Sequence, residues 1–290
     1  MYPLRRCKRK QKVTMAAQTT AAPAGDGGAT NCYTRRKLRA QHPMATIATT
    51  APQPTRPEAV APVWHTVGFL LLMFSAAFLQ AFRLVPFRVH TRMQFYVFTI
   101  IFEILMVSYV WLFGLRARGK SLREIIGGNW DSVAAVLLDI GISLLFGIIV
   151  LFVLGALRYM LGANPDAIRA IKALSPRSSF ELVVWVLLSS TAGFCEEVLF
   201  RGYLQRQFLA LTTRVEAAVA LQAIVFGAGH LYEGWKGAVS IVVYGAMFGA
   251  LAVMRKSLRP GMLQHAGYDS LVGFGAFLLT KYNRWPASLF

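Results

Sequence analysis

Long apolar runs alternate with short, mostly basic loops between residues 64 and 280. A helix that crosses a bilayer needs about 20 predominantly apolar residues, and the runs are of this order. We therefore predict an all-α fold, a polytopic transmembrane bundle of about seven to eight helices in a multi-pass integral membrane protein. The candidate spans are residues 64–82, 93–115, 133–157, 180–200, 215–231, 237–254 and 262–280.

The last four candidate spans are rich in Gly, Ala and Ser, and three of them carry charged side chains. Small residues let membrane helices approach closely, so we expect these spans to form the inside of the bundle. Two stretches between spans, residues 121–130 and part of 160–176, are expected to lie flat on the membrane surface.

The residues before the first span have a different composition. Residues 1–60 are rich in Ala, Thr, Pro and basic side chains and have little that forms a core, which predicts a disordered tail. Two explanations of this tail stay open: it is a targeting segment, or the translation start site has been assigned too far upstream. We divide the rest of the chain into N-terminal transmembrane helices, residues 61–178, and a second helical core, residues 179–283.

Composition supports the membrane assignment, because 56% of the residues are hydrophobic and only 15% are charged. A soluble domain has roughly 25% charged residues. The net charge of +18 would suit a nucleic-acid-binding protein, but 11 of the 31 Lys and Arg fall in the first 60 residues. Most of the others flank apolar runs, as is typical of membrane proteins. We expect the lipid bilayer as a partner, and no nucleic acid.

Three charges interrupt the apolar segment "GFCEEVLFRGYL". On a helix, Glu197 and Arg201 are four residues apart and share a face, so they can form an ion pair. Glu196 points about 100° away and has no partner in the segment. An unpaired carboxylate in apolar surroundings is a candidate proton acceptor. The alternative is a structural ion pair that joins two helices.

Two further clusters follow in the next apolar runs. "FGAGH" ends in His230, which is either a base or a hydrogen-bonded interior residue. "HAGYD" places His265 and Asp269 on one helix face. There the aspartate either hydrogen-bonds to the imidazole or binds a common partner together with it, such as a zinc ion. Simple hydrogen bonding between helices is the alternative. Together, the three clusters can hold a water, deprotonate it and stabilise an oxyanion, which is the equipment of a hydrolase.

Three other residues are interpreted as structural. Glu103 and Asp139 lie in earlier spans, and we expect both outside the catalytic site. Cys195 precedes the glutamate pair, but a neighbouring carboxylate disfavours a thiolate, so we expect a packing residue rather than a nucleophile.

The three motifs resemble those of the CPBP family, also called Abi, which contains the type II CAAX prenyl endopeptidases. The family pattern is EExxxR, then FxxxH, then HxxxN or HxxxD on successive transmembrane helices. Here it reads "EEVLFR", "FGAGH" and "HAGYD", within residues 180–280. The resemblance implies an intramembrane metalloendopeptidase of all-helical fold, with residues 179–283 as its catalytic core and a peptide or protein at the membrane as substrate.

The resemblance also implies roles for the motif residues. Glu196 would activate water and His230 would help to hold it. His265 and Asp269 would line the oxyanion or metal side, supported by Glu197 with Arg201. Whether the site binds a divalent metal such as zinc stays open, and the candidate ligands are His230, His265 and Asp269. The eukaryotic enzymes carry Asn where this chain has Asp269, and Asp accepts hydrogen bonds only.

Two other functions stay open. Buried carboxylates and histidines also form the proton relays of coupled transporters. The chain shows no duplicated halves, which such transporters usually have. A non-catalytic membrane scaffold, or a bacteriocin-immunity protein that reuses the site, is the third possibility.

Overall fold

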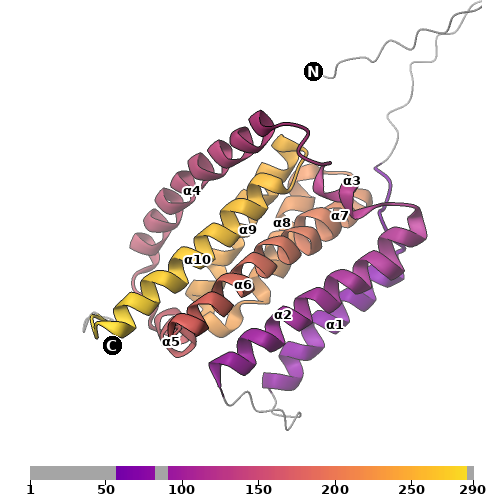
Figure 1. Cartoon of the computed structure of the whole chain (residues 1–290). Helices are drawn as coiled ribbons and strands as arrows, with labels where there is room; N and C mark the ends of the chain where they lie inside the picture. The colour runs from indigo at the N-terminus through magenta and orange to yellow at the C-terminus, as the bar shows by residue number, and fades with distance from the viewer. Residues whose placement is uncertain (1–56, 82–90, 286–290) are drawn as a thin grey trace, which may run out of the picture. The chain divides into compact units, whose positions relative to one another are not determined.

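The computed structural model describes residues 57–81 and 91–285 and contains helices without strands in these ranges (Figure 1). Most of the predicted disordered tail therefore lies outside the described residues. Residues 57–60 are described, and Val60 is buried. The boundary at residue 60 stays a prediction.

The α-helices follow the apolar runs. They are α1 (Val63–Ala81), α2 (Arg92–Tyr109), α3 (Leu122–Ile126), α4 (Val133–Leu161), α5 (Pro165–Leu174), α6 (Ser179–Glu196), α7 (Gln205–Thr212), α8 (Val215–Ala228), α9 (Gly234–Arg255) and α10 (Arg259–Lys281). Two π-helical segments, η1 (Val110–Leu115) and η3 (Glu197–Leu204), continue α2 and α6. Short 3₁₀ turns, η2 (Arg116–Arg118) and η4 (Leu231–Glu233), complete the order.

The described residues of the seven candidate spans are helical apart from a turn at residues 229–230, which confirms the all-α fold. Four continuous helical stretches are long and apolar enough to cross a membrane: residues 92–118, 133–161, 179–212 and 231–255. The apolar helices at 63–75 and 215–228 are shorter, and α10 does not reach the same apolar level. The two stretches expected to lie on the membrane surface contain the short helices α3 and α5. The protein is an integral membrane protein with several crossing helices.

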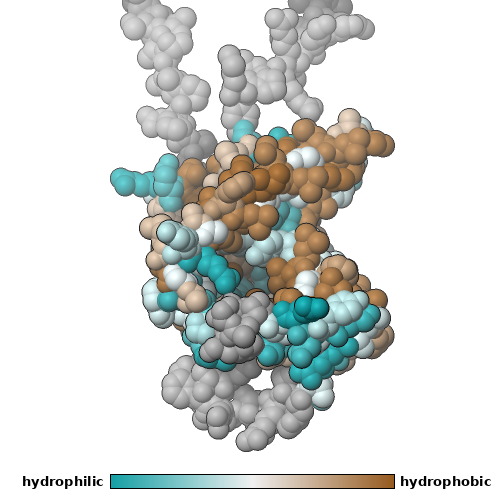
Figure 2. All heavy atoms as spheres, turned by 90° about the vertical axis from the view of Figure 1, so that its left-hand side faces the viewer, coloured by the Kyte–Doolittle hydropathy of each residue, from teal (hydrophilic) through white to brown (hydrophobic). Residues whose placement is uncertain are grey.

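Apolar side chains cover much of the outer surface. Along α4, Leu137, Leu144 and Phe152 are 63%, 67% and 76% exposed. Figure 2 shows brown, hydrophobic surface over much of the helical body, with teal gathered mainly toward the lower part of the view. In water such a surface would be strongly unfavourable, whereas lipid tails solvate it without cost.

Helix α6 lies between α10 and α2, and α8 packs along α9 (Figure 1). Glycines allow the closest contacts: a Cβ atom on Gly193 of α6 would lie 2.6 Å from the backbone nitrogen of Ala266 on α10. A Cβ on Gly227 of α8 would overlap Val242 of α9. The small residues of these spans therefore hold the helices that carry the motifs close together, as predicted.

A buried carboxylate joins α4 to the connection between α9 and α10. Asp139 is 1% exposed and accepts a hydrogen bond from the Trp130 indole at 2.9 Å. The Arg259 Nε lies 2.9 Å from its Oδ2, and Arg255 lies 3.5 Å from its Oδ1. Two guanidinium groups thus neutralise one carboxylate, in agreement with a structural role for Asp139.

Candidate functional site

The glutamate pair lies where helix α6 changes its winding. Glu196 is the last residue of α6 and Glu197 begins the π-helical segment η3. Every residue of η3 is buried, including its two charged ones. A π-helical turn is less favourable than an α-turn, and such turns are found frequently at functional sites.

The Arg201 guanidinium neutralises Glu197 inside the bundle. Arg201 Nη1 lies 3.0 Å from Glu197 Oε1, and the two side chains are 0% and 1% exposed. A weaker contact of 3.5 Å joins its Nη2 to the Gly245 carbonyl oxygen of α9. The guanidinium also lies 4.5 Å from the ring centroid of Phe226 and 5.2 Å from that of Phe248. The pair is therefore an ion pair enclosed by aromatic rings, which strengthen it through cation–π attraction.

One imidazole gathers the carboxylates of two helices. His265 of α10 lies with its Nδ1 3.3 Å from Glu197 Oε1. Its Nε2 lies 3.6 Å from Glu196 Oε2 and 3.6 Å from Asp269 Oδ2. The first contact is a hydrogen bond, and the other two are longer than hydrogen bonds. A water or a substrate atom between these groups would complete such contacts, as often happens in active sites that tighten on binding.

The cluster has one open side. His265 is 5% exposed, whereas the side chains of Glu196 and Asp269 are 19% and 34% exposed. Glu196 and Asp269 can therefore be reached from outside the helix bundle, and the ion pair behind them cannot.

His230 ends the FxxxH motif just after α8. Its Nδ1 lies 2.9 Å from the Phe226 carbonyl oxygen, so this nitrogen carries the proton and Nε2 of a neutral ring is left as an acceptor. The Phe226 ring contacts the His230 ring with centroids 4.8 Å apart and lies 6.3 Å from His265. His230 is also within electrostatic reach of Asp269. The second histidine thus adjoins the cluster across Phe226 instead of contacting His265.

The donor set does not fit a metal ion as the side chains lie. In the described ranges, no three His, Cys, Asp or Glu side chains come together as metal binding requires. His230, His265 and Asp269 therefore do not form the ligand set left open above, and no step below passes through a metal.

The predicted site residues are thus brought together by three packed helices. The His265 imidazole lies 3.3 to 3.6 Å from three carboxylates, those of Glu196, Glu197 and Asp269. Arg201 pairs with Glu197, and His230 lies beside this cluster. The sequence analysis placed Glu103 of α2 outside the catalytic site. Its side chain is 7% exposed, and the charges of Glu196 and Asp269 act on it. The signal in the sequence was an acid inside an apolar run.

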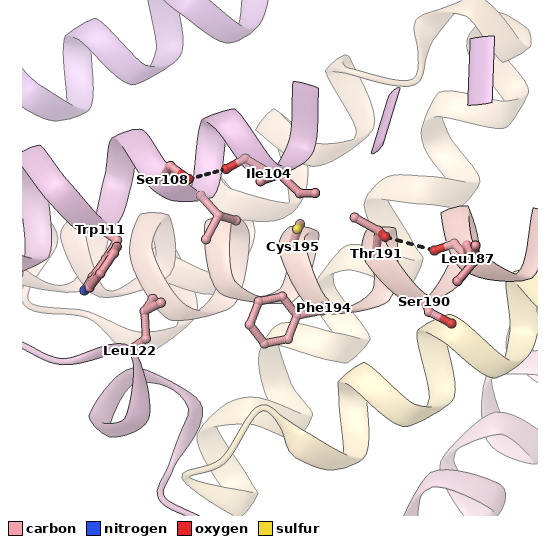
Figure 3. Close-up of a pocket in the computed structure, with 10 residues that line it drawn as sticks. Ile104, Ser108, Trp111, Leu122, Leu187, Ser190, Thr191, Phe194 and Cys195 are labelled. Carbon is pink, nitrogen blue, oxygen red and sulfur yellow. Dashed lines mark hydrogen bonds between the residues drawn. The ribbon is translucent and has the colours of Figure 1, made fainter. Parts of the chain in front are cut away.

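An apolar groove of about 440 Å³ lies between α2 with η1 and α6 (Figure 3), and its lining includes Phe194 and Cys195, which directly precede the glutamate pair in the sequence. Trp111 and Leu122 lie at one end and Leu187 at the other, with the Cys195 sulfur between the two helices (Figure 3). The hydroxyls of Ser108, Ser190 and Thr191 donate to carbonyls of their own helices, so these three lining groups are already hydrogen-bonded. Cys195 is 3% exposed and packs in the core, as expected.

The helices and the cluster define a polytopic integral membrane protein with a buried centre of carboxylates and imidazole. Residues 178–271 match the family model Type II CAAX prenyl endopeptidase Rce1-like, which confirms the resemblance seen in the motifs. This part of the chain is similar to that family, and the similarity supports, at family level, a CAAX-protease-like intramembrane endopeptidase. The match covers about a third of the chain. Neither a curated protein nor a solved structure matches the chain.

Proposed function

We propose that the protein hydrolyses a peptide bond at the membrane with a water molecule activated by Glu196. The observation that carries the proposal is the position of His265, whose two ring nitrogens lie 3.3 to 3.6 Å from three carboxylate groups. Burying this many ionisable groups is costly, and in membrane spans such groups usually mark function.

In the proposed reaction, Glu196 takes a proton from water and the resulting hydroxide attacks the peptide carbonyl carbon. The tetrahedral oxyanion then collapses, the carbon–nitrogen bond breaks, and the leaving amine receives the proton from Glu196. The free Nε2 of His230 accepts a hydrogen bond from the water. His265 and Asp269 line the opposite side. An imidazole that carries protons on both nitrogens donates to Glu197 through Nδ1 and to the oxyanion through Nε2, whereas a carboxylate accepts only.

Glu197 and Arg201 act as support. The hydrogen bond at 3.3 Å between Glu197 and His265 Nδ1 fixes the orientation of the imidazole ring. Arg201 in turn balances the charge of Glu197 inside the bundle. This arrangement is pre-organised, so it need not be rebuilt as charge develops in the reaction.

The groove between α2 and α6 supports a substrate with a large apolar group. Its walls are apolar and it adjoins the segment that contains Glu196. The family name refers to prenylated CAAX proteins, and an isoprenoid chain on a cysteine near the C-terminus has suitable chemistry. We propose such a lipidated peptide as the substrate class.

The test uses the purified full-length protein in lipid nanodiscs with a panel of CAAX peptides, each farnesylated, geranylgeranylated or unmodified. Glu196→Gln should lower kcat by about 10²- to 10⁴-fold, the usual contribution of a general base. Glu216→Gln, which changes an exposed acid at the start of α8, is the matched control and should cleave like the wild type. Near-normal cleavage by Glu196→Gln, or no cleavage of any peptide by the wild type, would refute the proposal.

A further inference from the structure

Glu103 of α2 is a buried acid that the family motifs do not include. Its side chain faces the bundle together with Tyr96, Met106 and Val107. It is 7% exposed, and its Oε2 has no hydrogen-bond partner among the described residues. A buried polar atom without a partner is rare and requires an explanation.

The packing of α2 on α6 shows what Glu103 faces. Arg92 contacts Glu181 at 3.2 Å, and the ring centroids of Tyr96 and Trp185 lie 5.4 Å apart. In each pair the two residues are 89 positions apart in the sequence. Two successive contacts with the same offset mean that the helices run in parallel. Continued along α2, the offset places Glu103 opposite residue 192 of α6.

Residue 192 is Ala192, which is buried and has a small side chain. On an α-helix it lies on the same stripe as Ser189, three residues before it, and Glu196, four residues after it. The Ser189 hydroxyl is buried and has no hydrogen-bond partner in the described part of the chain. Glu103 therefore faces a stripe of α6 that ends at Glu196.

Electrostatic interactions agree with this register. When ionised, the carboxylates of Glu103, Glu196 and Asp269 are close enough to repel one another, and the charge of Glu103 also acts on the thiol of Cys195. Glu103 is thus near the site, although it comes from a helix outside the segment that matches the family.

Glu196 itself has few partners. In the described ranges its carboxylate has no hydrogen bond, and its contact with His265 is 3.6 Å long. A general base works well only when its side chain is held in one orientation. Because no hydrogen bond within the described ranges holds the Glu196 carboxylate, a further polar group is needed to fix its orientation.

We propose that Glu103 is a positioning residue for Glu196 and holds its carboxylate by a hydrogen bond, directly or through one bridging water. The inference rests on the proposed function. It adds to the site a residue from α2, which ties the N-terminal helices to the hydrolysis carried out by the C-terminal ones.

Two substitutions separate hydrogen bonding from packing. Glu103→Gln keeps both donor and acceptor capacity, whereas Glu103→Leu keeps the volume only. In nanodiscs with a peptide that the wild type cleaves, Glu103→Leu should lower kcat by about 10- to 100-fold at unchanged KM, and Glu103→Gln should stay within about threefold of the wild type. Glu216→Leu is the control for the same chemical change at an exposed position.

If Glu103 had only a structural role, Glu103→Leu would lower the free energy of unfolding, but it would not lower kcat selectively while KM stays constant. Full activity of Glu103→Leu, or equal losses in both variants, would overturn the inference. If the wild type and Glu103→Leu cleave equally while Glu196→Gln does not, the proposed function holds and the role of Glu103 fails.

A second measurement needs no substrate. Unfolding equilibria in mixed detergent micelles are compared for Glu103→Leu, Glu196→Leu and the double variant. Residues joined by a hydrogen bond or a shared water should be non-additive by at least about fivefold in the unfolding equilibrium constant. Additive effects would overturn the inference whatever the wild type cleaves.

Discussion

The buried pair of Glu197 and Arg201 gives a prediction that depends on the fold and not on a substrate. Replacing Arg201 with Met keeps an apolar stem of similar length among the aromatic rings of Phe226 and Phe248 and removes the cation. Glu197 would then stay 1% exposed with a single hydrogen-bond partner, the imidazole of His265.

The magnitude follows from this burial. Removing one partner of a buried ion pair leaves an uncompensated charge and costs about 3–5 kcal/mol. Removing both charges is far less costly, because neither group then needs a counter-ion. The double variant Arg201→Met with Glu197→Gln should therefore recover to within about 2 kcal/mol of the wild type. The Gln oxygen still accepts the hydrogen bond from His265.

The assay is the free energy of unfolding in mixed detergent micelles, with helicity followed by circular dichroism. Arg169→Met serves as the control, since Arg169 pairs with Asp166 at the surface and the two side chains are 66% and 49% exposed. An exposed pair of this kind contributes about 0–1 kcal/mol. A loss below about 1 kcal/mol for Arg201→Met, or a double variant as unstable as the single one, would refute the reasoning.

Two further substitutions test how the helices are joined. Gly193→Ala places a Cβ 2.6 Å from the Ala266 nitrogen, where ordinary contact begins at 3.4 Å, so α6 and α10 must separate by about 1 Å. A displacement of this size should lower kcat by about 10²-fold. The control is Gly275→Ala on α10, which should cleave normally because no atom lies within 4 Å of the added Cβ. Equal activity of the two variants would contradict this account. Asp139→Asn removes the charge that balances two arginines and should lower the free energy of unfolding by about 1.5–3 kcal/mol in the same micelle assay, where an unchanged value would argue against a structural role.

Much of the helical architecture could be read directly from the chain. The runs beginning near Trp64 and Val133 are apolar over enough residues to predict a helix without any knowledge of their neighbours. The motif residues were also recognisable, because charged side chains such as Glu196 and Arg201 are costly in apolar runs and therefore conspicuous there.

The convergence of these residues depended on the tertiary structure. Spacing along one helix predicted the contact of Glu197 with Arg201, but it could not show that His265 on α10 would lie against both glutamates of α6 and η3. Nor could it show that the Phe226 ring would lie near both His230 and His265, or that three ligands would not be grouped for a metal in the described ranges.

The sequence by itself determined which segments are apolar helices and which side chains are costly to bury within them, because both depend on local chemistry. Only the packing of the helices decided which of those side chains meet. Glu103 shows the difference: by itself it is one acid in an apolar helix, and only the parallel register of α2 on α6 places it opposite Ala192, one helical turn before Glu196. Register depends on the shapes of both helices, which neither segment contains alone.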